Sequence, residues 1–83
     1  MKRRSAAERR SIAAELIMGA AIGLTREQLI EAVKTDHPHA TDEAIMRGAF
    51  FAASRREIEE RTIPTIYEVG VLLRRNLPPD PWW

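Results

Sequence analysis

Residues 41–61, TDEAIMRGAFFAASRREIEER, carry the strongest indication of how the chain folds. Thr41 is a good N-cap residue, and the acidic residues 42 and 43 suit the first turn of a helix. Between residues 44 and 53 the only charged residue is Arg47, and apolar residues occupy most sides of the expected helix. A helix that is apolar on most sides is buried centrally or shared with a partner. This half of the stretch therefore predicts the central helix of the fold.

The second half of the stretch, residues 54–61, is almost wholly charged. It contains opposite charges four residues apart, in the pairs Arg55–Glu59, Arg56–Glu60 and Glu57–Arg61. Such pairs stabilise an exposed helix by about 0.2–0.5 kcal/mol each. We therefore expect one long helix over 41–61, with a solvated charged end.

The residues before this stretch predict two more helices, 5–22 and 26–35. Apolar residues recur at helical spacing in the first of them, at positions 12, 16, 20 and 24, and Gly23 is its expected stop. Thr25 and Gln28 have the spacing of a capping box, in which each side chain bonds the backbone amide of the other residue.

Residues 66–75 predict a fourth helix, although their pattern also allows a strand. Thr65 and Glu68 have the spacing of a second capping box. The pattern of alternate residues at 65, 67, 69 and 71 is typical of a strand, as is the frequency of β-branched residues in this stretch. No second strand is evident to pair with such a strand. We expect an all-α fold, a small bundle of three to four helices packed around the 41–61 helix.

The 83 residues are enough for one domain with a thin margin of stability. We expect a single helical domain over 5–75, a basic arm over 1–10 that begins the first helix, and an extended tail over 76–83. The net charge is +1, but residues 1–10 hold an excess of +4, so the other residues sum to −3. The positive charge is therefore a property of the arm.

Several function classes find little support in this composition. The chain has no cysteine and only two histidines, His37 and His39, which flank a proline in a polar turn. We therefore expect no metal site and no cofactor. No catalytic motif is visible, and an enzyme or a small-molecule substrate is not expected. The apolar run 12–24 contains a glutamate and is shorter than the roughly 20 residues that span a bilayer, so we expect a soluble, cytoplasmic protein.

The favoured function is a non-catalytic regulatory, adaptor or inhibitor module that binds another protein or a second copy of itself. Tryptophan and tyrosine are enriched where binding energy concentrates. The expected contact residues are Phe51, Tyr67, Trp82 and Trp83. Phe51 and its neighbour Phe50 point about 100° apart on a helix, so we expect one of them to enter the core. The other is expected either to meet the 66–75 helix or to lie in a contact with another molecule. The tryptophans either dock on a partner or fold back over the bundle.

The alternative function is a helix-turn-helix regulator that binds DNA. The two capped helices around residues 36–40 resemble the helix-turn-helix layout, which places the start of its second helix in the major groove. The residues suited to contact DNA are Lys2, Arg3, Arg4 and Arg47. The acidic residues 42 and 43 at the same helix start would repel phosphates. Two packed helices in a small bundle, with a solubilising basic arm, are therefore the favoured interpretation.

Overall fold

The computed structural model describes residues 2–55 and 58–77, with side chains described from residue 7 onward. Over these residues the chain forms only helices: α1 (Lys2–Ala21), α2 (Arg26–Asp36), α3 (Asp42–Ala53), the short 3-10 helix η1 (Glu60–Thr62) and α4 (Ile63–Arg75). The predicted all-α fold is confirmed, and residues 66–75, whose pattern also allowed a strand, lie in a helix. The expected contacts of Trp82 and Trp83 and the ion pairs of Arg56 and Glu57 lie outside the described residues.

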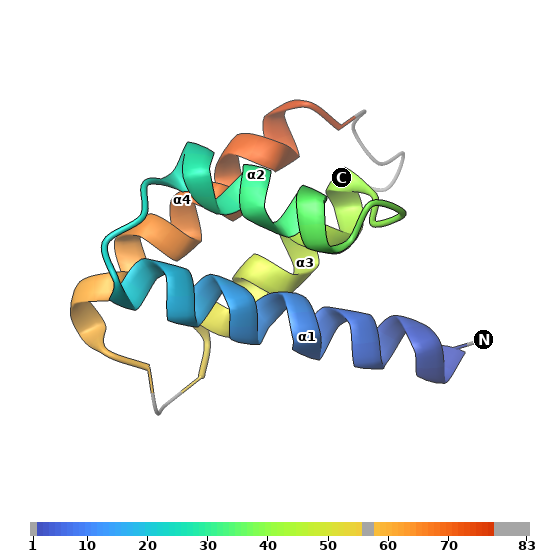
Figure 1. Ribbon diagram of the computed structural model, residues 1–83, viewed down its shortest axis with the longest axis horizontal. Coiled ribbons are helices and arrows are strands. Elements are labelled where there is room, and N and C mark those ends of the chain that lie inside the picture. Colours follow the sequence, from blue (N-terminus) through green and yellow to red (C-terminus); the bar gives the residue numbers. More distant parts are fainter. Residues whose placement is uncertain (1, 56–57, 78–83) are drawn as a thin grey trace.

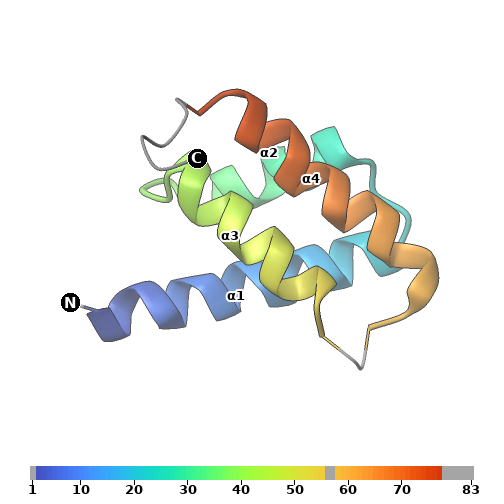
Figure 2. The ribbon, with the colours of Figure 1, turned by 180° about the vertical axis from the view of Figure 1, so that it is seen from behind.

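α3 lies between α1 and α4 and makes its main contacts with these two helices. α2 also rests on α1 and α4, so that α2 and α3 occupy opposite sides of them. Figure 1 shows α2 nearest the viewer, and Figure 2 shows α3 nearest the viewer from behind. The two helices of the helix-turn-helix-like pair are therefore consecutive in the chain, but each packs mainly on other elements.

The core is built from small and medium apolar side chains of α1, α2, α3 and α4, together with Ile58 from the segment after α3. Its buried members are Ile12, Ala13, Leu16, Ala20, Leu29, Val33, Ile45, Ala49, Ala52, Ile58, Ile66, Val69 and Leu73. Fully burying a Leu or Ile side chain contributes about 1.5–3 kcal/mol relative to leaving it exposed. The core is the main source of stability in a chain that has no disulfide.

The apolar residues of α3 on more than one side are explained by contacts within the chain. On one side Gly48 faces Ile12 of α1, and a Cβ atom at position 48 would lie 2.7 Å from Ile12 Cγ2. On the other side the ring of Phe50 lies against Gly70 of α4. α3 is thus packed between two helices, and these contacts account for the apolar residues on two of its sides.

α3 ends at Ala53, and the predicted continuation to residue 61 is wrong. The Ser54 hydroxyl donates a hydrogen bond to the Phe51 carbonyl oxygen at 2.8 Å and closes the last turn. The chain then turns, and Ile58 is buried with only 8% of its surface exposed. Burying an isoleucine contributes about 1.5–3 kcal/mol, whereas each exposed charge pair contributes about 0.2–0.5 kcal/mol. Burial of Ile58 therefore outweighs the charge pairs that favoured a longer helix.

The sequence predicted that Arg61 forms an ion pair along a helix, but Arg61 has a different role in the structure. Its Nε donates to Glu59 Oε2 at 2.9 Å, and its terminal NH2 group donates to the Ala21 carbonyl oxygen at 3.0 Å. A carbonyl at the end of a helix has no partner within that helix. Arg61 therefore caps the end of α1. Gly23, with φ of 97°, provides the helix stop that the sequence predicted.

α4 begins at Ile63, three residues before the predicted start. Pro64 lies in the first turn, where the amide hydrogen that proline lacks would have no partner within the helix. Thr65 is therefore inside the helix, and the capping box predicted for Thr65 and Glu68 is wrong. The N-cap is Thr62, whose side chain makes no cap bond and donates instead to the Glu59 carbonyl oxygen at 2.7 Å.

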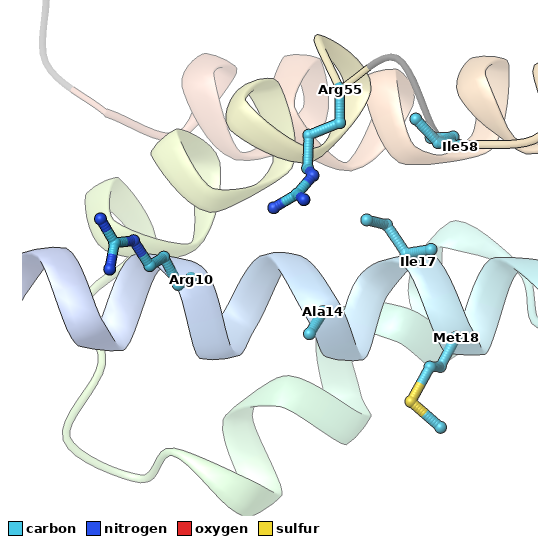
Figure 3. A pocket seen from close by; sticks show the side chains of 6 residues that line it. All are labelled: Arg10, Ala14, Ile17, Met18, Arg55 and Ile58. Atoms are coloured by element: carbon cyan, nitrogen blue, oxygen red, sulfur yellow. The ribbon is translucent and has the colours of Figure 1, made fainter.

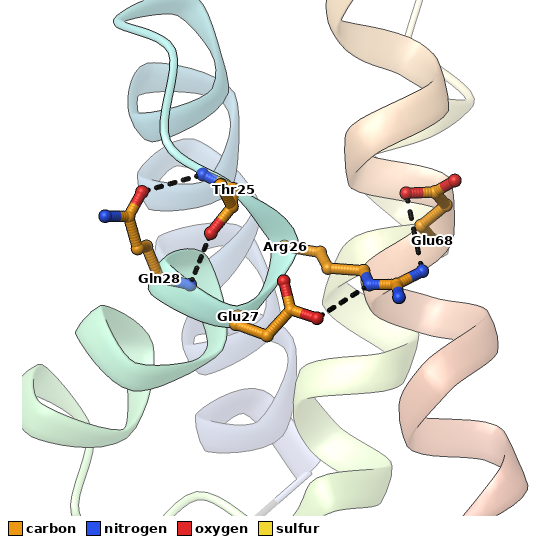
Figure 4. Close-up of polar contacts among 5 residues, drawn as sticks. All are labelled: Thr25, Arg26, Glu27, Gln28 and Glu68. Carbon is orange, nitrogen blue, oxygen red and sulfur yellow. Dashed lines mark hydrogen bonds and ion pairs between the residues drawn. The ribbon is translucent and has the colours of Figure 1, made fainter.

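The capping box predicted at the start of α2 is confirmed (Figure 4). The Thr25 amide donates to Gln28 Oε1 at 2.9 Å, and the Gln28 amide donates to Thr25 Oγ1 at 3.2 Å. Arg26, the residue after Thr25, pairs with Glu27 at 3.0 Å and reaches Glu68 of α4 at 3.7 Å. The box fixes where α2 begins, and Arg26 links that end to α4.

α1 begins at Lys2, three residues earlier than predicted, so the basic arm is part of the helix. Among its described side chains, the first buried one is Ile12. Figures 1 and 2 both show the N-terminal end of α1 extending past the other helices. In the described parts of the chain, none of the helices combines the length and the apolar character that crossing a membrane requires.

Candidate docking surface on helix α1

A shallow groove runs between α1 and the segment that follows α3. We call it the α1 groove; it is lined by Arg10, Ala14, Ile17, Met18, Arg55 and Ile58. Its volume is about 320 Å³, near the lower end of the roughly 300–1,000 Å³ typical of ligand pockets. Figure 3 shows the side chains of Arg10 and Arg55 at one end and those of Ile17, Met18 and Ile58 toward the other. The groove therefore has a charged end and an apolar end.

Two large apolar side chains beside this groove are exposed. Met18 is 70% exposed, and Ile22, which lies one helical turn further along, is 78% exposed. Together with Ala14 they follow a spacing of four residues, along one side of α1 and just past its end at Ala21. Apolar surface that continues into a groove is characteristic of interaction sites. Met18 and Ile22 are the strongest indication of a docking surface among the described residues.

Phe51, a predicted contact residue, lies at the charged end of the groove. It is half-buried and packs against the core. The guanidinium carbons of Arg9 and Arg55 each lie 5.8 Å from the centroid of its ring. An arginine stacked on an aromatic ring is held in place by the ring's negative face. Phe51 therefore helps to position the positive charge beside the groove and is itself partly covered.

Tyr67, the other described contact residue, lies on a different side of the molecule. It is 53% exposed on α4, and its ring centroid lies 5.5 Å from that of Phe50, with an angle of 58° between the ring planes. Phe50 thus turns toward α4 and Phe51 toward α1, as their angular separation predicts. The structure does not bring Phe51 and Tyr67 together into one site.

The residues proposed for DNA contact are also separated or already paired. Arg47 donates to Glu43 Oε2 at 2.8 Å, and Lys34 pairs with Asp42 at 3.2 Å. Residues 2–4 lie in the first turn of α1, and their side chains are outside the described set. The start of α3 therefore presents carboxylates that are paired with arginine and lysine side chains. Such a surface is poorly suited to reading a base edge.

A small polar cluster joins α1 to the end of α2. His37 Nε2 lies 3.2 Å from Glu15 Oε1, and both side chains are largely buried. The pKa of Glu15 is raised, first by burial and then by the neighbouring Asp36 carboxyl, against the opposite effect of His37. His39 is exposed. No group of three potential metal ligands occurs among the side chains that the structure describes.

The α1 groove was not predicted from the sequence. The helical stripe of residues 12, 16, 20 and 24 identified the buried side of α1, and Ile12, Leu16 and Ala20 are indeed buried. Met18 and Ile22 lie off that stripe, and large apolar residues off a core stripe are the signal that indicates a second apolar side. Arg55 and Ile58 reach the groove only because α3 stops at Ala53.

Comparison with protein families, with curated proteins and with solved structures gives no match for this chain. Its function is therefore inferred from the chemistry of its own surface. On that surface the α1 groove combines exposed apolar side chains with two arginines.

Proposed function

We propose that the protein is a small non-catalytic regulatory or adaptor module that acts by binding another protein through the α1 groove. The observation that carries this proposal is the exposure of Met18, which lines the groove, and of Ile22, four residues further along the chain. Leaving such side chains in water contributes nothing to folding, whereas covering them with a partner removes apolar surface from water. Binding of a partner is thus the property that best accounts for this surface.

The size of the chain supports the same proposal. A domain of 83 residues buries a modest share of its surface, and a small protein often gains stability from a partner. A second copy of the chain is one such partner. A homodimer would use the α1 groove rather than α3, because α1 and α4 already cover the apolar sides of α3.

DNA binding is the alternative proposal, and one feature supports it. Residues 2–10 of α1 carry five basic residues against one acidic residue on a helix that extends past the core. A basic helix can lie along phosphates, and such binding weakens steeply as salt is added. Undetectable affinity for mixed duplex DNA at low salt would exclude this alternative. The exposed apolar residues of α1 favour protein binding over it.

Site-specific photocrosslinking tests the main proposal. A benzophenone amino acid replaces Ile22 in one version of the full chain, and replaces the exposed Glu31 of α2 in a control version. Both are irradiated in lysate of the source cells, in the presence of excess wild-type chain or excess Met18→Asp chain. We expect a discrete crosslinked product from position 22 that the wild-type competitor removes and the Met18→Asp competitor leaves. The same products from both positions, or equal competition by both chains, would contradict the proposal.

A further inference from the structure

We infer that the occupant of the α1 groove is an amphipathic helix of a partner protein, anchored by apolar side chains and carrying carboxylates that face Arg10 and Arg55. This inference rests on the proposed function and names the chemistry of the partner. It follows from three properties of the groove: the order of its residues along α1, the charge around one end, and the small side chain between the two ends.

The order of residues along α1 sets the spacing required of the partner. Arg10 and Met18 are eight residues apart, which corresponds to about 12 Å along a helix at 1.5 Å per residue. A partner helix that lies along the groove would therefore carry its carboxylate about two turns from its apolar anchor. Anchors one turn apart match Met18 and Ile22, which are themselves four residues apart.

The charge around the groove selects acidic partners. Arg10 and Arg55 line one end, and Arg9 lies beside them over the Phe51 ring. The basic excess of residues 1–10 continues from this end along α1. An arginine can bind a carboxylate through two parallel hydrogen bonds, and like charges placed together disfavour the wrong partner. A basic helix would thus be rejected at the end where an acidic one is held.

The small side chain in the middle of the groove favours a helix as the occupant. Ala14 lies between the charged and the apolar end, as Figure 3 shows, and it allows the backbone of a partner to approach α1. The described part of the chain has no strand whose edge could accept an extended peptide. An amphipathic helix laid in a groove uses anchors at spacings of three and four residues, which matches the exposed residues of α1.

A display selection tests this inference with defined probes. The library consists of 18-residue peptides with a helix-favouring frame and randomised positions on one side, and the bait is the folded full chain. Parallel baits carry Arg10→Glu, Arg10→Glu with Arg55→Glu, and Met18→Asp. A matched control bait carries Arg75→Glu, the same charge change at an exposed position on α4. Circular dichroism checks that each bait is folded; the Arg10→Glu single variant, at an exposed helical position, keeps the test usable if the double variant does not fold.

We expect the wild-type and Arg75→Glu baits to enrich the same peptides, with apolar anchors one turn apart and Asp or Glu about two turns away. The affinity of such a peptide, measured by fluorescence anisotropy, should fall roughly tenfold with the double reversal and at least as much with Met18→Asp. The double-reversal bait should enrich Lys or Arg at the acidic positions.

Two other outcomes separate this inference from the function on which it rests. Apolar anchors without any acidic preference, and with affinity that depends on Met18 alone, would overturn the inference and leave the docking function standing. If no enriched peptide loses affinity in the Met18→Asp chain, both the inference and the proposed docking function are overturned.

Discussion

Gly70 of α4 faces the ring of Phe50 on α3 so closely that a Cβ atom at position 70 would lie 2.7 Å from Phe50 Cε1. This distance is shorter than a normal contact between carbon atoms, which is about 3.5–4.0 Å. The missing side chain at position 70 therefore gives the ring its place between the two helices. The same ring contacts Tyr67 one turn earlier on α4, so one phenylalanine fixes how α3 and α4 pack.

The first prediction concerns Gly70→Ala. Alanine favours a helix over glycine by about 1 kcal/mol, but overpacking at a tight contact costs about 1–3 kcal/mol. We expect a net loss of up to about 2 kcal/mol in the free energy of unfolding, measured by urea denaturation. In a Phe50→Leu background the same change should be neutral or stabilising, because the atoms that clash are removed. Equal effects in both backgrounds would show that the ring does not limit position 70.

The second prediction contrasts two threonines that both begin a capping-box pattern. Thr25→Ala should lower the free energy of unfolding by about 0.5–2 kcal/mol, because the Gln28 amide loses its acceptor. Thr65→Ala should change it by less than about 0.5 kcal/mol, because Thr65 lies within α4 and does not cap it. Thermal or urea denaturation of both variants under the same conditions provides the measurement. A larger loss for Thr65→Ala would place the start of α4 where the sequence pattern put it.

The third prediction concerns the pH dependence that Glu15 contributes. Its pKa in the folded state is raised above the ordinary value of 4.5, so between the two values the folded state holds more protons than the unfolded state. The contribution of Glu15 to stability is therefore full below pH 4.5 and is lost as the pH rises through the folded pKa.

Glu15→Gln measures that contribution. We expect the difference in free energy of unfolding, wild type minus variant, to fall as the pH rises from about 4 to about 7. His39→Gln is the control, because His39 is exposed and lies outside the contact between Glu15 and His37. A difference for Glu15→Gln that is independent of pH, or that rises with pH, would contradict the assignment.

The fourth prediction concerns Arg61, which bonds the Ala21 carbonyl oxygen at the end of α1. The side chain is 61% exposed, so Arg61→Ala should lower the free energy of unfolding by less than about 1 kcal/mol. The local effect should be clearer: hydrogen exchange at the Leu24 amide, which bonds the Gly19 carbonyl in the same turn, should become faster. Arg74→Ala, on α4, serves as the comparison and should leave that amide unchanged.

Local chemistry in the sequence predicted the fold class and most of the helix positions. Side-chain and backbone preferences that act over a few residues predicted threonine caps at residues 25 and 41 and a helix stop at Gly23. All three features are present in the structure. The errors arose where burial competes with local preference. Charge pairs favoured a helix through residue 61, but Ile58 gains more by entering the core than those pairs supply.

The docking surface depends on these long-range contacts and was therefore harder to predict. Phe51 was identified as a contact residue, but its neighbours Arg9 and Arg55 come from two different segments that only the folded chain brings together. Met18 could be recognised as an apolar residue off the buried stripe of α1. Ile58, on the opposite wall of the groove, reaches it through the turn after α3. No short-range pattern in the sequence indicates that position.

The central claim, that the α1 groove receives an acidic amphipathic helix, is tested most directly by methyl NMR. The chain is labelled at the methionine methyl groups and titrated with the most enriched library peptide. Met18 lies in the groove and is 70% exposed, whereas Met46 is half-buried on α3 and does not line the groove. We expect the Met18 methyl signal to shift with saturation while that of Met46 stays in place. A saturating shift of Met46 alone, or no shift of Met18 at any peptide concentration, would contradict the claim.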